Sequence, residues 1–310
     1  MNRLNNVVDF IKAYKEGYYF SDLDFDNKQS FYELVNYCQD NLEDETCLCI
    51  LGPCYLYGLG IEKNFNEALK CFTKANGKGN LDGLNGLGFC YLNGLGVEID
   101  QDRAASYFLA SAKQGNTKAM EIIGSLYNDG VVFNEDINEC IKWYKKAASN
   151  ENYVAQYNLA QKYYDGDGVE HNINKAIELY KLAASKNDAK AMFNLGLIYN
   201  YESGYINPKE AAKWYLMGAE NGNHKCQANL ASMYQEGIGV EKNLIQAIKW
   251  YEKAAAQNDF IALNNLGDIY MNGDPLYRDY KKALHYYEHC YQAGHIEVKE
   301  EIEKLKKLVK

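Results

Sequence analysis

Residues 87–115 read LGFCYLNGLGVEIDQDRAASYFLASAKQG, and this stretch contains the pattern that decides the fold. Its tyrosine recurs through the chain at a spacing of 36 residues, with one step of 35. The equivalent tyrosines are Tyr55, Tyr91, Tyr127, Tyr163, Tyr199, Tyr234 and Tyr270. Because neighbouring positions keep the same phase, we infer seven tandem repeats, the signature of a solenoid or a similar array.

An Asn or Asp follows each of these tyrosines by eight or nine residues. Its side-chain oxygen can accept a hydrogen bond from an unpaired N–H group at the start of a helix. These residues are Asn64, Asp100, Asp136, Asn172, Asn207, Asn243 and Asp279. A small residue and then an aromatic residue follow at intervals of four, which is the spacing of one helix face. The aromatic residues are Phe72, Phe108, Tyr144, Tyr180, Tyr215, Tyr251 and Tyr287.

Glycine follows the tyrosine by three residues in six repeats, at Gly58, Gly94, Gly130, Gly166, Gly237 and Gly273. Glycine readily adopts the left-handed conformation that ends many helices. Each repeat is therefore predicted to contain a helix ending near the tyrosine (helix A), a turn, and a helix beginning at the Asn or Asp (helix B). Helix B is predicted to end at Gly79, Gly115, Asn187, Gly222, Asn258 and Gly294.

The repeats resemble those of the Sel-one-like repeat family, a relative of the tetratricopeptide repeats. The resemblance is carried by Leu87-Gly88-x-x-Tyr91-x-x-Gly94-x-Gly96-Val97 and by the pairs Trp143-Tyr144, Trp214-Tyr215 and Trp250-Tyr251. It covers residues 45–295. It implies an all-α fold, namely a right-handed α/α superhelical solenoid of stacked helix-turn-helix repeats, and a role in protein–protein interaction.

We divide the chain into three parts. Residues 1–44 are predicted to be a degenerate N-terminal capping repeat and residues 296–310 a C-terminal capping helix, because the end repeats of a solenoid otherwise expose their core. Pro53 lies inside the first helix A, where it is expected to kink the helix or delay its start. The seven repeats are placed at residues 45–80, 81–116, 117–152, 153–188, 189–223, 224–259 and 260–295.

The composition narrows the classes of partner. The net charge is −9 and the pI is near 5.2, whereas nucleic acids and anionic membranes select basic surfaces. The first residues carry charges in place of an apolar signal segment. We therefore expect a cytoplasmic protein that binds neither nucleic acid nor membrane, with export by a signal-independent route left open.

The residues that could act in catalysis or metal binding are better explained by structural roles in the repeats. The nine cysteines include no C-x-x-C pair and occupy positions that are predicted to be buried. His285 and His289 have the spacing of a metal-binding pair, but the equivalent residues of other repeats are mostly lysines and other surface types. Paired glycines follow helices, not strands, and lack the lysine of a phosphate-binding loop. We expect no metal, no cofactor and no small-molecule substrate.

The candidate binding residues lie on helix A, near the glycine or alanine three residues before the motif tyrosine. Helix A is expected to line the concave side, where amides can bond to a peptide backbone and aromatic rings provide contact area. The residues are Asn85, Phe89, Tyr157, Asn158, Gln161, Phe193, Asn194, Asn229, Asn264, Asn265 and Asp268. The amides could instead bridge adjacent helices. A second candidate surface lies at the irregular turns, with Phe133, Tyr201, Tyr205 and Tyr277.

The leading hypothesis is a non-enzymatic scaffold or adaptor that binds a protein or peptide on the concave surface of helix A. One alternative is an immunity or regulatory protein that binds and inhibits a specific enzyme or toxin. A remote alternative is a metal-dependent enzyme. The sequence names no partner.

Overall fold

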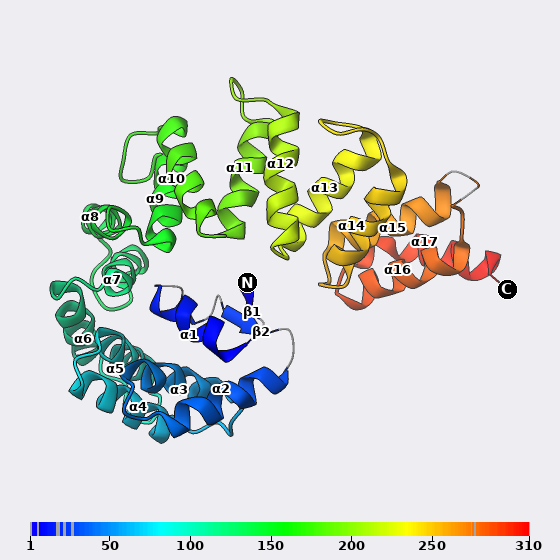
Figure 1. Ribbon diagram of the computed structural model, residues 1–310. Coiled ribbons are helices and arrows are strands. Elements are labelled where there is room, and N and C mark those ends of the chain that lie inside the picture. The colour runs from blue at the N-terminus through cyan, green and yellow to red at the C-terminus, as the bar shows by residue number, and fades with distance from the viewer. Residues whose placement is uncertain are drawn as a thin grey trace. The chain divides into compact units, whose positions relative to one another are not determined.

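The computed structural model describes residues 2–4, 6–16, 19–20, 23–25, 28–273, 275 and 277–309 (Figure 1). The chain forms two compact units, Met1–Lys186 and Asn187–Lys310. No described helix is both long and apolar enough to cross a membrane.

The first unit begins with two short strands and two helices, β1 (Asn2–Leu4), α1 (Val7–Lys15), β2 (Leu23–Phe25) and α2 (Lys28–Asp40). The strands pair in parallel, with Asn2 opposite Leu23 and Leu4 opposite Phe25. This pairing was not predicted. Four helix pairs follow, α3 (Glu45–Tyr57) with α4 (Phe65–Gly77), α5 (Leu81–Asn93) with α6 (Gln101–Lys113), α7 (Thr117–Asp129) with α8 (Ile137–Ala148), and α9 (Tyr153–Asp165) with α10 (Ile173–Ser185).

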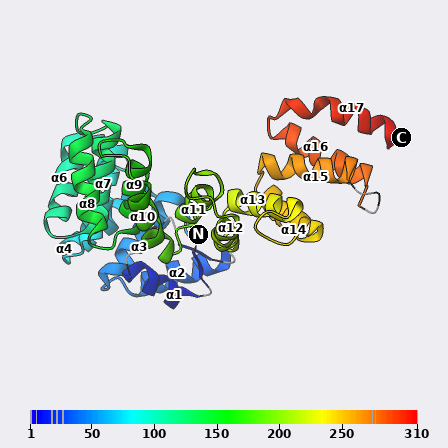
Figure 2. The same cartoon turned by 90° about the horizontal axis from the view of Figure 1, so that it is seen from above.

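The second unit contains three helix pairs and a C-terminal helix. The pairs are α11 (Ala189–Tyr201) with α12 (Pro208–Glu220), α13 (His224–Glu236) with α14 (Leu244–Ala255), and α15 (Phe260–Asn272) with α16 (Tyr280–Gln292). A short 3-10 helix, η2 (Ile296–Val298), leads into α17 (Lys299–Leu308), which lies beside α16 (Figure 2). Ile302 and Leu305 of α17 are buried in the core of this unit.

The predicted caps start all seven copies of helix B. In each repeat the side chain of the Asn or Asp accepts a hydrogen bond from a backbone N–H group of the first helical turn. The backbone N–H group of the same residue donates to the carbonyl oxygen of the motif tyrosine, at 2.7 to 3.1 Å. One residue therefore closes the turn through its backbone and begins the next helix through its side chain, a role that Asn and Asp perform well.

The predicted glycine ends of helix A are confirmed in five repeats and wrong in the seventh. Gly58, Gly94, Gly130, Gly166 and Gly237 adopt the left-handed conformation. Gly273 instead has φ −68° and ψ −177°, an extended conformation. Of the two effects expected from Pro53, a late start of the helix does not occur, because α3 is 13 residues long, as is α5, and continues through Pro53.

The aromatic residue of helix B packs against the glycine of helix A. A methyl group on that glycine would lie only 2.3 to 2.8 Å from the ring in five repeats. The pairs are Gly52 with Phe72, Gly88 with Phe108, Gly124 with Tyr144, Gly196 with Tyr215, and Gly267 with Tyr287. The small residue lets the two helices approach until the ring fills the space between them, and this contact repeats along the core of each unit.

Candidate functional site

The predicted binding residues divide between the two units, and all of them lie on helix A of their repeat. In the first unit Asn85 and Phe89 lie on α5, and Tyr157, Asn158 and Gln161 lie on α9. In the second unit they lie on α11 (Phe193, Asn194), α13 (Asn229) and α15 (Asn264, Asn265, Asp268). Helix A of one repeat contacts helix A of the next between α3 and α5, α5 and α7, and α11 and α13, so these helices form one layer in each unit. We call it the helix A layer.

Several of the predicted polar residues bridge helices. Asn158 Nδ2 on α9 donates to Glu121 Oε1 on α7 at 3.1 Å. Asn85 Nδ2 on α5 donates to Asn116 Oδ1 at the start of α7 at 3.2 Å. Gln161 Oε1 accepts from the hydroxyl of Tyr180 at 3.0 Å. These amides have the bridging role that the sequence left open as the alternative to ligand contact.

Asp268 is used in the same way in the second unit. Its carboxylate accepts from the hydroxyl of Tyr287 at 2.8 Å and from Asn264 Nδ2 at 3.2 Å. The aromatic candidates pack against tyrosine rings of helix B or are partly exposed. The ring of Phe193 lies 6.3 Å from that of Tyr215, and Phe89 is 37% exposed.

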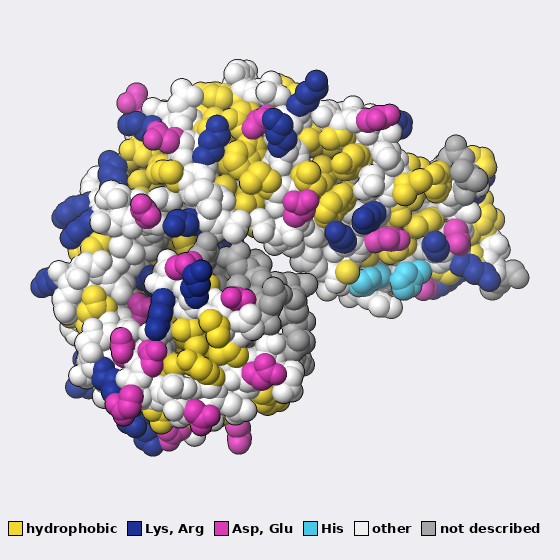
Figure 3. Space-filling model, viewed as in Figure 1, with side chains coloured by type: hydrophobic (Ala, Val, Ile, Leu, Met, Phe, Trp, Pro, Cys, Tyr) yellow, Lys and Arg dark blue, Asp and Glu magenta, His cyan; other side chains and the backbone are white. Residues whose placement is uncertain are grey.

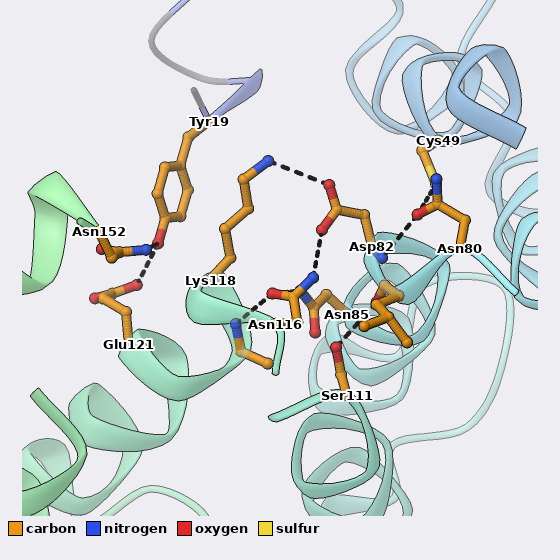
Figure 4. A network of polar contacts seen from close by, with 12 residues as sticks. Tyr19, Cys49, Asn80, Asp82, Asn85, Ser111, Asn116, Lys118, Glu121 and Asn152 are labelled. Atoms are coloured by element: carbon orange, nitrogen blue, oxygen red, sulfur yellow. Dashed lines mark hydrogen bonds and ion pairs between the residues drawn. The ribbon is translucent and has the colours of Figure 1, made fainter. Parts of the chain in front are cut away.

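In the first unit, a residue of the N-terminal segment contacts the helix A layer (Figure 4). The hydroxyl of Tyr19 donates to Glu121 Oε2 at 3.1 Å and accepts from Asn152 Nδ2 at 3.1 Å. The Tyr19 ring meets the ring of Tyr153 edge-on, with the centroids 5.8 Å apart. The backbone N–H group of Tyr19 donates to the hydroxyl of Tyr153 at 3.4 Å. A single side chain thus contacts two repeats that are more than 100 residues away in the sequence.

A buried ion pair lies beside this contact. Lys118 Nζ is 3.1 Å from Asp82 Oδ2, and the two side chains are only 13% and 19% exposed. The same ammonium group lies 4.4 Å from the centroid of the Tyr14 ring and 5.5 Å from that of Tyr19. Asn116 Nδ2 donates to the other oxygen of Asp82 at 2.8 Å, so each carboxylate oxygen has a partner within the protein.

Burial and neighbouring carboxylates shift the titration of both tyrosines. Burial raises the pKa of Tyr19 well above its usual value, and the charge of Glu121 raises it further. Burial also raises the pKa of Tyr14, with the charge of Asp82 as the next cause. Both hydroxyls therefore remain protonated to a higher pH than an exposed tyrosine, which preserves the donation from Tyr19 to Glu121.

Sequence reasoning missed Glu121, Lys118, Asn152 and Tyr19. A signal was available for Glu121, because it occupies the helix A position held by Asn85, Tyr157, Phe193 and Asn264 in other repeats. A carboxylate in a column of amides and aromatic rings indicates a special local role. No periodic signal pointed to Tyr19, which lies outside the seven repeats.

In the second unit, a cavity of about 270 Å³ joins the two surfaces that the sequence treated as separate. It is lined by Asn200, Tyr201, Pro208, Asn229, Ser232, Met233 and Ile238. Asn229 comes from the helix A layer. Tyr201 ends α11 at the irregular turn of the fifth repeat and is 68% exposed. Figure 3 shows hydrophobic side chains gathered over α11 to α13.

A second cavity, of about 360 Å³, lies at the next irregular turn. Tyr277, predicted as a turn contact, lines it together with Ile245, Ile248, Tyr270 and Lys282. It contains none of the eleven predicted helix A residues.

The cysteines and histidines have structural environments. All nine cysteines are buried and unpaired, and burial raises the pKa of Cys54 to about 12 and that of Cys90 to about 11. Thiols with raised pKa values, such as these two, are poor nucleophiles and poor metal ligands. Cys47 differs, because a hydrogen bond with Cys38 lowers the pKa of its thiol. His289 Nε2 lies 2.8 Å from Asn258 Oδ1. Within the described part of the chain, no three His, Cys, Asp or Glu side chains are grouped to hold a metal ion.

Comparisons with known proteins agree with the repeat architecture. A crystal structure of a Sel1 repeat protein from Oxalobacter formigenes is 29% identical, with a TM-score of 0.70, and the match covers 82% of this chain and 100% of that one. Yeast Tom70 is 16% identical with a TM-score of 0.51, over 90% of this chain and 59% of that one. An immunity protein from Pseudomonas aeruginosa is 20% identical with a TM-score of 0.40, over 62% and 74%. No curated protein matches the chain.

The family model for the Sel1 repeat matches all seven copies, at residues 47–80, 81–116, 117–152, 154–188, 189–223, 224–259 and 261–295. This fold is typical of non-enzymatic scaffolds for protein interaction. Because the matched segments make up most of its length, the chain belongs to the Sel1 repeat family.

Proposed function

We propose that the chain is a non-enzymatic scaffold that binds a peptide or protein segment at the cavity around Asn229 and Tyr201 in the second unit. The observation that carries this proposal is the joining of a helix A amide and an exposed aromatic ring in one cavity. The amide of Asn229 can both donate to and accept from a peptide backbone.

Besides the polar residues Asn200 and Ser232, the cavity offers an apolar surface to a side chain of the partner. Met233 is buried, and Ile238 is 48% exposed at the rim. Burial of an apolar side chain between them would contribute about 25 cal/mol for each Å² removed from water. Tyr201 adds a rigid ring that loses little entropy when it is covered.

A photocrosslinking residue in place of Ile238 would identify the partner, and its affinity would then be measured by calorimetry. We expect the double variant Tyr201→Ala/Asn229→Ala to weaken binding about tenfold or more, since truncation of a central contact costs on the order of 1 to 2 kcal/mol. Ile206→Ala is the matched control, because Ile206 is 61% exposed on the same turn but does not line the cavity. Equal affinity of both variants and the wild type would refute the assignment.

A further inference from the structure

Tyr19 contacts the helix A layer of the first unit in the manner of a bound ligand. Its partners, Glu121, Asn152 and Tyr153, come from the third and fourth repeats. They engage three features of the residue, namely the hydroxyl group, the ring and the backbone N–H group. Together these contacts specify a tyrosine side chain and place its backbone close to the start of α9.

The hydroxyl of Tyr19 is selected by two opposite hydrogen bonds. Glu121 is only 7% exposed and can only accept from it, whereas Asn152 Nδ2 can only donate to it. A phenylalanine would fill the same space but would leave a buried carboxylate oxygen and an amide without this partner. A site that bonds to a hydroxyl in this way discriminates strongly against the analogue that lacks it.

The attachment of the N-terminal segment does not depend on this contact. Phe10 of α1 is fully buried against the first repeat, and its ring lies 5.5 Å from that of Phe20 and 6.4 Å from that of Phe31. This aromatic cluster anchors the segment to α2 and α3. The Tyr19 contact is therefore separate from this anchor and lies further along the helix A layer, at the third and fourth repeats.

We propose that Glu121, Asn152 and Tyr153, with Lys118 beside them, form a second binding site that is specific for a tyrosine whose backbone N–H group also faces the site, and that Tyr19 occupies this site in cis. A partner would be a chain with such a tyrosine, and it would bind by displacing Tyr19. Lys118 favours the ring further, because its ammonium group lies 5.5 Å from the Tyr19 ring centroid. This site is independent of the cavity at Asn229.

Tethering predicts a measurable competition. A side chain linked through a short segment has an effective concentration in the millimolar range. A free segment of the same sequence must compete with it, so it binds the wild-type chain weakly. Removal of the tethered tyrosine exposes the site without altering its walls.

The test uses the full chain and a fluorescein-labelled peptide with the sequence of residues 12–25, followed by fluorescence anisotropy. We expect Tyr19→Ala to bind the peptide at least tenfold more tightly than the wild type. The same peptide with phenylalanine at the position of Tyr19 should bind that variant about tenfold more weakly, and adding Glu121→Gln should weaken the tyrosine peptide similarly. Tyr57→Ala is the matched control, because Tyr57 is 59% exposed and lies outside the site.

Tyr19→Phe provides a second route to the same answer. It keeps the ring against Tyr153 and removes only the hydroxyl, so it should fold normally and bind the peptide with intermediate affinity. Equal binding of the peptide by the wild type and both Tyr19 variants would overturn the proposal. So would equal affinity for the tyrosine and phenylalanine peptides. Neither result would bear on the cavity at Asn229, which is tested by other variants.

Discussion

At the scale of single residues, the end of helix B shows how the backbone limits sequence. In all seven repeats the second or third residue after the end of helix B has a positive φ. In six repeats this residue is a Gly or Asn, as predicted. The exception is Glu151, with φ 61°. A side chain with a Cβ is strained in this region, by about 1 kcal/mol for residues other than Gly and Asn. The third repeat therefore carries a local cost that the others avoid.

Replacing Glu151 should relieve this strain. We expect Glu151→Gly to raise the free energy of unfolding by about 0.5 to 1 kcal/mol, measured by urea denaturation. The ion pair lost with Lys186 spans 3.9 Å at an exposed position and contributes little. Gly115→Ala, at the equivalent position with φ 96°, should destabilise the chain. A loss of stability in Glu151→Gly would contradict the strain argument.

At the scale of elements, the caps of helix B should matter more than other surface residues. Asn172→Ala removes the side-chain acceptor from the first turn of α10 and should lower the free energy of unfolding by about 1 kcal/mol. Asn172→Asp keeps the acceptor, as Asp136 does in the preceding repeat, and should be close to neutral. Urea denaturation of both variants measures the difference. Equal stability of the two would show that the cap oxygen contributes nothing here.

These elements could be predicted because they depend on local rules. The caps of helix B and the left-handed ends of most copies of helix A each involve residues within one repeat, and seven copies make the pattern plain. The aromatic–glycine contact is equally local, but it was not predicted. Gly273 was mispredicted because the seventh turn has another backbone path, which the glycine alone does not reveal. The cavity at Asn229 required two segments, each visible in the sequence, to be placed side by side.

At the scale of the whole molecule, the Tyr19 contact could not be predicted, because it joins residues more than 100 positions apart and belongs to no repeat. The parallel pairing of β1 and β2 was missed for a different reason, because strands of three residues carry no usable periodicity. Long-range contacts of this kind depend on how a nonrepeating segment happens to fit a repeating surface.

Buried tyrosines should make the folded chain sensitive to alkali. Burial raises the pKa of Tyr251 to about 12 and raises the pKa of Tyr144, Tyr215 and Tyr287 further. In the unfolded chain these hydroxyls ionise near pH 10. Because the folded pKa is the higher one, this stabilisation is complete below about pH 10 and is lost as the pH rises through 12.

Urea denaturation at pH 7, 9, 10 and 11 should therefore show the free energy of unfolding beginning to fall above about pH 8.5, where the buried thiols ionise in the unfolded chain, and falling more steeply above pH 10. Tyrosinate absorbance should rise in two phases, with exposed tyrosines ionising first and the buried ones ionising as the chain unfolds. A single phase centred near pH 10, with no loss of helical circular dichroism, would show that the buried hydroxyls ionise in the folded state.

The reach of Tyr19 has a consequence for how this gene can change. Repeat proteins vary by gaining or losing whole copies through recombination, and most contacts survive because each copy touches only its neighbours. The N-terminal segment is anchored on the first repeat and contacts the third and fourth, so it spans a fixed number of repeats. Loss of the second copy would bring a different surface under Tyr19, so this contact can form only with the present number of copies ahead of Glu121.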